Sequence, residues 1–251
     1  MSNATTAPHV SLVTGASRGI GRAIAARLAR DYAGTVIIHY LQNDTEATKT
    51  ESLVTESGGH GVRVKANLVH PDGVDALFDE VRQHVDHVDV FVHCAAVTAF
   101  KPLFDVRPNQ WDLTMNVNAR SFLLCAQHLA PMMQRGSMIA ISSSGAQRAV
   151  PNYGALGVTK AALEATVRGL AAELARRGIR VNGVTGGLVL TETFSAFPNS
   201  KELLAAAVQR TPMGRAGTPE EFAAVVSFLA GPDAAWICGQ IINTDGGFAL
   251  W

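Results

Sequence analysis

Short apolar runs alternate with amphipathic stretches of helical length along nearly all of the 251 residues. Such runs predict parallel strands buried on both faces, and the stretches between them predict crossover helices. The predicted strands are Val10–Thr14, Thr35–Tyr40, Gly61–Ala66, Val88–Cys94, Ser137–Ser142, Arg180–Val184 and Gln240–Thr244. The predicted helices are Ile20–Tyr32, Glu46–Glu56, Pro71–His84, Asn109–Met133, Asn152–Arg176, Lys201–Gln209 and Pro219–Leu229. We therefore expect an α/β fold, a Rossmann-type doubly wound parallel sheet of about seven strands with helices on both faces.

The composition limits the classes of partner. Lys+Arg and Asp+Glu balance at 21 each, so we expect neither a nucleic-acid nor a membrane partner, since either calls for a basic patch. No apolar run reaches the length of a membrane span and the first ten residues do not resemble a signal peptide, which predicts a cytoplasmic protein. We expect a single domain over residues 1–251, with residues 1–8 as a flexible N-terminal segment.

The sulfur and imidazole side chains do not suggest a metal site. Cys94, Cys125 and Cys238 are odd in number, far apart and in apolar surroundings, which favours buried free thiols over disulfides. His84 and His87 lie in a polar helical segment without partner ligands, so no metal is expected.

A glycine-rich segment, Thr14–Gly21, joins the first predicted strand to the first predicted helix. Gly15 suits the tight turn that ends the strand, Gly19 lets the backbone approach a pyrophosphate, and Gly21 lets the helix pack close to the sheet. The N-terminus of the helix then offers N–H groups to phosphate. The spacing Gly-x3-Gly-x-Gly differs from the general dinucleotide fingerprint, and such a turn can also be purely structural.

A tyrosine and a lysine, Tyr153 and Lys160, lie seven positions apart at the start of the longest predicted helix after residue 150. On an α-helix that step turns about 700°, so both side chains would share one face about 10 Å apart along the axis. A phenol and an ammonium in this arrangement can frame one small ligand. The alternative is a chance pair on a solvated face.

These motifs together resemble the short-chain dehydrogenase/reductase superfamily from Val10 to Gly247. Thr14–Gly21 resembles its cofactor loop, Asn118 lies at its catalytic Asn position, Ser143 at its Ser position, and Asp245–Gly247 resembles its C-terminal signature. The resemblance implies a doubly wound sheet that binds NAD or NADP, with hydride transfer at the carboxyl ends of the strands.

The position of the tyrosine separates branches of the superfamily. Ketone and alcohol enzymes place it four residues before Lys and thirteen after Ser, and both offsets point here to Leu156. A Tyr/Lys pair seven apart instead resembles the enoyl-thioester reductases of fatty-acid synthesis. Ser144–Tyr153 and Thr211–Arg215 resemble their NADPH-using members, which also have Ser at position 143 where many enoyl reductases have a second tyrosine.

The expected chemistry assigns a role to each catalytic candidate. Hydride addition to the β-carbon of an unsaturated thioester drives negative charge onto the carbonyl oxygen, and the Tyr153 hydroxyl would stabilise it. Lys160 would hold the nicotinamide ribose and favour charge at the phenol. Ser143 would add a hydrogen bond to substrate, or is one polar residue of the Ser142–Ser144 run. Asn118 would support a water relay, or only cap or bend its helix.

Cofactor preference depends on the end of the second strand. An enzyme that prefers NAD usually has an acid there for the ribose 2′-hydroxyl, whereas Ile38–Asn43 has none and Asp44 comes late. Arg18 can instead bind a 2′-phosphate, or is a solvated loop cation, so NADPH is expected. The expected cofactor-binding residues are Gly15, Ser17, Arg18, Gly19, Ile20, Gly21, Tyr40, Asn67, Leu68, Ala95, Lys160, Gly187 and Thr191.

Two departures from the superfamily pattern lie near the cofactor and substrate. His93-Cys94 replaces the usual Asn-Asn after the fourth strand, which makes His93 either a core histidine or a change to the cofactor site. Leu188–Asn199 is rich in apolar residues, including Leu190, Phe194 and Phe197, and either covers substrate or seals the core.

The sequence therefore predicts an NADPH-dependent reductase of an enoyl thioester carried by acyl carrier protein or coenzyme A. One alternative is a ketone reductase of the same superfamily that uses Tyr153 in an unusual register, and another is a non-catalytic nucleotide sensor. The two longest predicted helices carry apolar residues beyond one face, and by resemblance this favours a homotetramer or homodimer.

Overall fold

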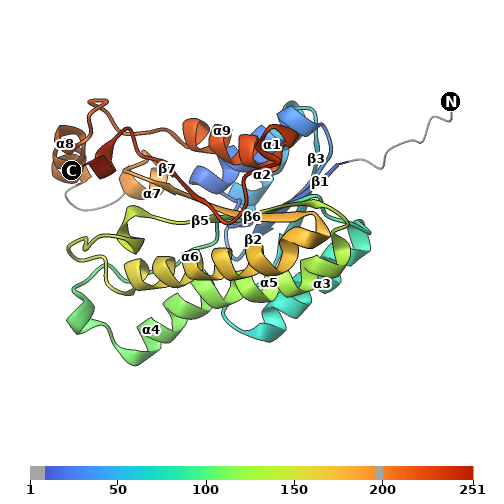
Figure 1. Cartoon of the computed structure of the whole chain (residues 1–251), viewed down its shortest axis with the longest axis horizontal. Coiled ribbons are helices and arrows are strands. Elements are labelled where there is room, and N and C mark those ends of the chain that lie inside the picture. Colours follow the sequence, from blue (N-terminus) through green and yellow to red (C-terminus); the bar gives the residue numbers. More distant parts are fainter. Residues whose placement is uncertain (1–8, 196–199, 251) are drawn as a thin grey trace.

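The computed structural model describes residues 9–195 and 200–250 (Figure 1). The segment 1–8, predicted to be flexible, lies outside the described residues. The strands are β1 (Val10–Thr14), β2 (Thr35–Tyr40), β3 (His60–Lys65), β4 (Val90–His93), β5 (Gly136–Ile141), β6 (Ile179–Gly186) and β7 (Ile241–Thr244). The helices are α1 (Gly19–Tyr32), α2 (Asp44–Glu56), α3 (Pro71–His84), α4 (Pro108–Met115), α5 (Ser121–Leu129), α6 (Ala155–Leu174), α7 (Glu192–Ser195), α8 (Ser200–Arg210) and α9 (Pro219–Ala230). Short 3-10 turns span Leu103–Asp105, Ala130–Met132, Ser144–Ala146, Ala175–Arg177, Pro232–Ala234 and Phe248–Leu250.

The strands form one parallel sheet in the order β3-β2-β1-β4-β5-β6-β7. Helices α1, α2 and α9 cover one face, and α3, α5 and α6 cover the other (Figure 1). Because side chains of a strand alternate between faces, Leu12 packs in one hydrophobic core and Val13 in the other. The predicted doubly wound fold is confirmed.

The strand order reverses between β1 and β4, which is the topological switch point of the sheet. In open α/β sheets ligands bind outside the carboxyl ends of the strands at such a point. Thr14 and His93, the last residues of β1 and β4, are paired across it. The fold therefore predicts a binding site formed by the segments that follow these two residues.

The predicted helix Asn109–Met133 is not one regular α-helix. Helix α4 ends at Met115, a π-helical turn spans Asn116–Arg120, and α5 continues to Leu129. A π turn adds a residue to the helical path and shifts the side chains that follow. It places Asn118 in the buried interior.

The predicted helix Asn152–Arg176 starts three residues too early. Helix α6 begins at Ala155, because Asn152 (φ 58°) and Gly154 (φ 53°) lie in backbone regions that an α-helix excludes. Tyr153 therefore precedes the helix that carries Lys160. The prediction that the two side chains share one helical face is wrong.

The cysteines are free thiols, with Cys125 buried and Cys94 and Cys238 half-buried. Among the described residues, no cluster of His, Cys, Asp and Glu could hold a metal ion. Within the same residues no helix is long and apolar enough to cross a membrane.

Candidate active site

A hydrogen-bonded pair of hydroxyls lies just beyond β5. Ser143 follows the strand, and its Oγ is 2.8 Å from Tyr153 Oη. The Tyr153 ring packs against Gly145, where an added Cβ would lie 2.5 Å from a ring carbon, so only glycine permits this approach. The bend at Asn152–Gly154 turns the tyrosine back toward the end of β5. The predicted catalytic residues Tyr153 and Ser143 are thus in contact.

The Tyr153 phenol is held in its protonated form. Burial raises its pKa above the usual value, and the hydrogen bond with Ser143 opposes that rise only in part. In the described structure these two causes set the direction of the pKa shift of Tyr153. Lys160, whose ammonium the sequence suggested would favour charge at the phenol, is not among them. A neutral phenol is suited to donate a hydrogen bond or a proton to an oxygen that gains charge.

Lys160 reaches the same end of β5 from α6. Its side chain is buried, with the residue 4% exposed, and its Nζ donates to the Ile141 carbonyl at 2.6 Å. Burial lowers its pKa to about 8, and the nearby Cys94 opposes that shift. The ammonium is therefore fixed at the end of β5, on the carbonyl of the residue two before Ser143.

The side-chain amide of Asn118 forms hydrogen bonds with two segments of the site through both its oxygen and its nitrogen. Its Oδ1 accepts from Val97 N at 2.8 Å, and its Nδ2 donates to Val97 O at 2.9 Å and to Thr159 Oγ1 at 3.1 Å. Asn118 thereby joins the segment after β4 to the residue before Lys160. These contacts favour a positioning role over direct contact with substrate.

A groove of about 600 Å³ opens at the switch point, along the carboxyl ends of β1 to β4. Every predicted cofactor residue except two lines it, namely Gly15, Ser17, Arg18, Gly19, Ile20, Gly21, Tyr40, Asn67, Leu68, Ala95 and Thr191. Gly187 lines a separate cavity of about 110 Å³, and Lys160 is buried with its Nζ bonded to the Ile141 carbonyl. The groove has a volume that suits a bound cofactor, and its lining spans the segments after β1 to β4.

The groove can accept phosphate at the start of α1. Arg18 is the N-cap residue of α1 and has an extended backbone. Its side chain makes no capping hydrogen bond to the helix. Within the described chain, the N–H groups of that first turn therefore face the groove without a side-chain cap. The exposed Arg18 side chain adds a cation to the lining of the groove.

The nearest carboxylate to the end of β2 is already engaged. Asp44 accepts from Tyr40 Oη at 2.7 Å and pairs with Lys65 at 3.0 Å. Among the residues that line the groove there is no Asp or Glu. This arrangement suits a ribose that carries a 2′-phosphate better than one with a free 2′-hydroxyl.

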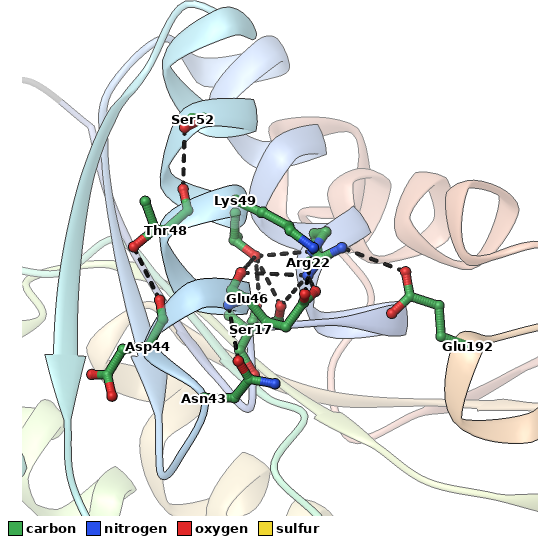
Figure 2. Close-up of polar contacts among 11 residues, drawn as sticks. Ser17, Arg22, Asn43, Asp44, Glu46, Thr48, Lys49, Ser52 and Glu192 are labelled. Carbon is green, nitrogen blue, oxygen red and sulfur yellow. Dashed lines mark hydrogen bonds and ion pairs between the residues drawn. The ribbon is translucent and has the colours of Figure 1, made fainter. Parts of the chain in front are cut away.

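An arginine that sequence reasoning missed, Arg22, fixes the glycine-rich segment from behind. Figure 2 shows its guanidinium between Ser17, Glu46 and Glu192. It donates to the Ser17 carbonyl at 2.5 Å, is ion-paired with Glu46, and lies 3.7 Å from Glu192 of α7. No motif marks this position, because its two carboxylate partners come from α2 and α7, far from it in the sequence.

The segment after β4 forms the wall beside the tyrosine. The ring of Phe100 lies 6.0 Å from the ring of Tyr153, and Lys101 forms a parallel bridge with Tyr153. Phe100 is half exposed, which leaves an apolar surface next to the phenol. Of the predicted substrate-covering segment, Leu190 is exposed, whereas Phe197 lies outside the described residues.

A family model described as Enoyl-(Acyl carrier protein) reductase matches residues 15–249. The chain belongs to the short-chain dehydrogenase/reductase superfamily. This short-chain dehydrogenase/reductase is 43% identical over 245 residues to 1-cyclohexenylcarbonyl-CoA reductase of Streptomyces collinus, covering 96% of this chain and 87% of that protein. It is therefore an oxidoreductase of this superfamily.

Solved structures of the superfamily share its fold. The angucycline C-6 ketoreductase LanV with bound NADP has a TM-score of 0.89 at 33% identity, covering 97% of this chain and 96% of that one. L-sorbose reductase from Gluconobacter frateurii, complexed with NADPH and L-sorbose, has a TM-score of 0.88 at 27% identity, covering 96% of each chain.

Proposed function

We propose that this short-chain dehydrogenase/reductase uses NADPH to reduce the carbon-carbon double bond of an enoyl thioester. The observation that carries the proposal is the Ser143–Tyr153 pair, with the tyrosine ahead of α6 and Leu156 in the register that ketone reductases of the superfamily give to tyrosine. A proton donor bound to Ser143 also argues against a sensor without turnover, since binding a nucleotide does not require one.

Each residue of the site has a separate role in the proposed reaction. When bound, NADPH supplies the hydride that adds to the β-carbon of the substrate. The carbonyl oxygen gains charge, and the protonated Tyr153 hydroxyl donates a hydrogen bond to it while Ser143 orients that hydroxyl. The enolate takes the Tyr153 proton, which ends on the α-carbon and gives the saturated thioester and NADP⁺, and the tyrosine is reprotonated from water. Phe100 offers apolar surface for the acyl group.

Two kinds of observation support NADPH as the cofactor. The groove is lined by Arg18 and by no carboxylate among the described residues, and Asp44 is engaged by Tyr40 and Lys65. Two structural neighbours carry NADP or NADPH. The same comparison supports a second candidate function, reduction of a ketone, because LanV is a ketoreductase. The Streptomyces collinus relative favours the enoyl assignment, since its name describes a double bond conjugated to a coenzyme A thioester.

The two candidates separate when crotonyl-CoA and acetoacetyl-CoA are offered side by side. We expect NADPH oxidation with the crotonyl thioester and little or none with the acetoacetyl thioester. The rate is followed by the absorbance of NADPH, with product identity checked by mass spectrometry. Robust reduction of the keto thioester without reduction of the enoyl one would make the chain a ketone reductase.

Replacing Arg18 with alanine should weaken NADPH binding about tenfold and leave NADH binding nearly unchanged. The guanidinium is exposed where it lines the groove and can pair with the 2′-phosphate, which NADH lacks. Fluorescence titration with both nucleotides measures the two dissociation constants. Arg107→Ala is the matched control, because Arg107 is exposed just before α4 and does not line the groove. Equal losses for both nucleotides in Arg18→Ala would show that Arg18 does not read the phosphate.

We also propose that the chain forms a homotetramer or homodimer. Most apolar residues of the two long predicted helices face the sheet, for example Phe122 and Leu163. Leu113, Leu123 and Val158 remain exposed on α4, α5 and α6. Multi-angle light scattering at micromolar concentration should give a mass of two or four chains, and a monomer mass would exclude this assembly.

A further inference from the structure

Two buried histidines hold the first two residues of the glycine-rich segment. His39, in β2, accepts the Gly15 N–H at its Nδ1 over 3.2 Å, and its Nε2 lies 3.2 Å from the Ala66 carbonyl. A carbonyl only accepts, so Nε2 must carry the proton and Nδ1 must be the acceptor. The backbone carbonyl of His39 also accepts the Ala16 N–H at 2.9 Å. His39 therefore binds two consecutive amides of the segment.

His93, at the end of β4, is fixed in the same tautomer by the residue before Gly15. Thr14 Oγ1 accepts the N–H groups of Cys94 at 3.1 Å and Ala95 at 3.2 Å. Both lone pairs of the hydroxyl are then used, so its proton must go to His93 Nδ1, 3.1 Å away.

The other nitrogen of His93 completes the chain of hydrogen bonds. Its Nε2 carries the remaining proton and faces Ser121 Oγ at 3.4 Å, and Ser121 in turn donates to the Val117 carbonyl at 2.6 Å. Every hydrogen bond from Thr14 through His93 to Ser121 therefore has a fixed donor and a fixed acceptor. A protonated His93 would break it.

Both imidazoles are neutral, as these bonds require. His39 is 2% exposed and His93 is fully buried, and burial lowers their pKa values to about 4 and about 3. The charged and titratable groups that face His93 are Lys160 and His39, and Lys160 lowers the pKa of His93 further.

We propose that His39 and His93 are positioning residues for the dinucleotide. They set the gap between the glycine-rich segment and the Cys94–Ala95 backbone, the two walls of the groove at the switch point. The tolerance there is small, because a Cβ added at Gly15 would lie 2.8 Å from Ala95 Cα. His93 takes the place of the first Asn of the usual Asn-Asn pair, so the departure in sequence has a physical role. The inference rests on the proposed NADPH site and not on the enoyl substrate.

The test compares substitutions that keep or remove the acceptor at Nδ1. An asparagine Oδ1 can replace that acceptor, whereas leucine cannot. We expect His93→Leu and His39→Leu to raise the dissociation constant for NADPH about tenfold, and the corresponding Asn variants to stay within about threefold of wild type. Ser137→Ala removes one buried hydrogen bond, to the Leu229 carbonyl, at the start of β5 and away from the groove, and it should bind NADPH like wild type.

Stability is measured on the same samples to separate positioning from a merely structural role. A structural role would lower the melting temperature while the folded protein bound NADPH with wild-type affinity, and that result overturns the proposal. If His93→Leu does not fold, Thr14→Val removes the hydrogen bond to His93 Nδ1, together with the acceptor of the Cys94 and Ala95 N–H groups, and should give at least about a tenfold loss. If His39→Leu does not fold, His39→Phe removes the acceptor of the Gly15 N–H and keeps a planar ring, and it should give the same loss of about tenfold. Wild-type affinity in either variant overturns the proposal for that histidine. Wild-type protein that does not bind NADPH would instead refute the cofactor assignment.

Discussion

Tyr153→Phe is expected to lower turnover on the order of 10²-fold or more and to leave NADPH binding nearly unchanged. The substitution keeps the ring that packs against Gly145 and Phe100 and deletes only the hydroxyl that bonds to Ser143 Oγ at 2.8 Å. The enolate oxygen would then lose its donor at the moment charge develops. Single-turnover rates with crotonyl-CoA, beside fluorescence titration of NADPH, measure both quantities.

Ser143→Ala is the matched control for this substitution. It removes the orienting partner and leaves the phenol in place, so its loss of turnover should be smaller than that of Tyr153→Phe. If Tyr153→Phe keeps wild-type turnover, the proton donor is another group, and Ser143 is the next candidate.

The fold was predictable from the sequence because one physical constraint acts along the whole chain. A parallel strand buried on both faces must be mostly apolar, and all five residues of β1 are buried, with Ser11 and Thr14 as its two polar members. The amphipathic stretches then had to cross over and cover both faces. The glycine-rich segment could be placed for the same reason, since it follows the first strand directly.

The local geometry of the catalytic residues was not predictable in the same way. Periodicity continues through Tyr153 into the helix, and only the positive φ angles of Asn152 and Gly154 show that the helix begins later. Likewise, the apolar pattern around Asn118 is compatible with either an α-helix or a π turn. Both errors lie at the candidate active site, where local preference yields to the geometry that the site needs.

The histidines illustrate a further limit of sequence reasoning. A histidine in an apolar strand such as β2 reads as a core position, and its partners become visible only when strands are paired. His39 contacts Gly15 after β1 and Ala66 after β3, which are far from it in the sequence. The resemblance to the superfamily marked His93 as a departure but gave no partner for it.

Lys160→Met should impair both turnover and NADPH binding, whereas Tyr153→Phe should impair turnover alone. We expect turnover to fall on the order of 10²-fold and NADPH binding to weaken about tenfold. Methionine suits the buried position but lacks the ammonium that donates to Ile141 O and that we expect to hold the cofactor ribose. Single-turnover rates and NADPH titration measure the two effects, with the exposed Lys201→Met as control.

The pH dependence of NADPH binding provides an independent check on Lys160. Burial lowers its pKa to about 8, so the ammonium is present below that pH and is lost as the pH rises through it. Wild-type affinity for NADPH should therefore decline above about pH 8, and the decline should be absent from Lys160→Met. Should the variant bind NADPH as wild type does at pH 7, the lysine does not hold the ribose, and its burial beside Ile141 serves the structure of the strand end alone.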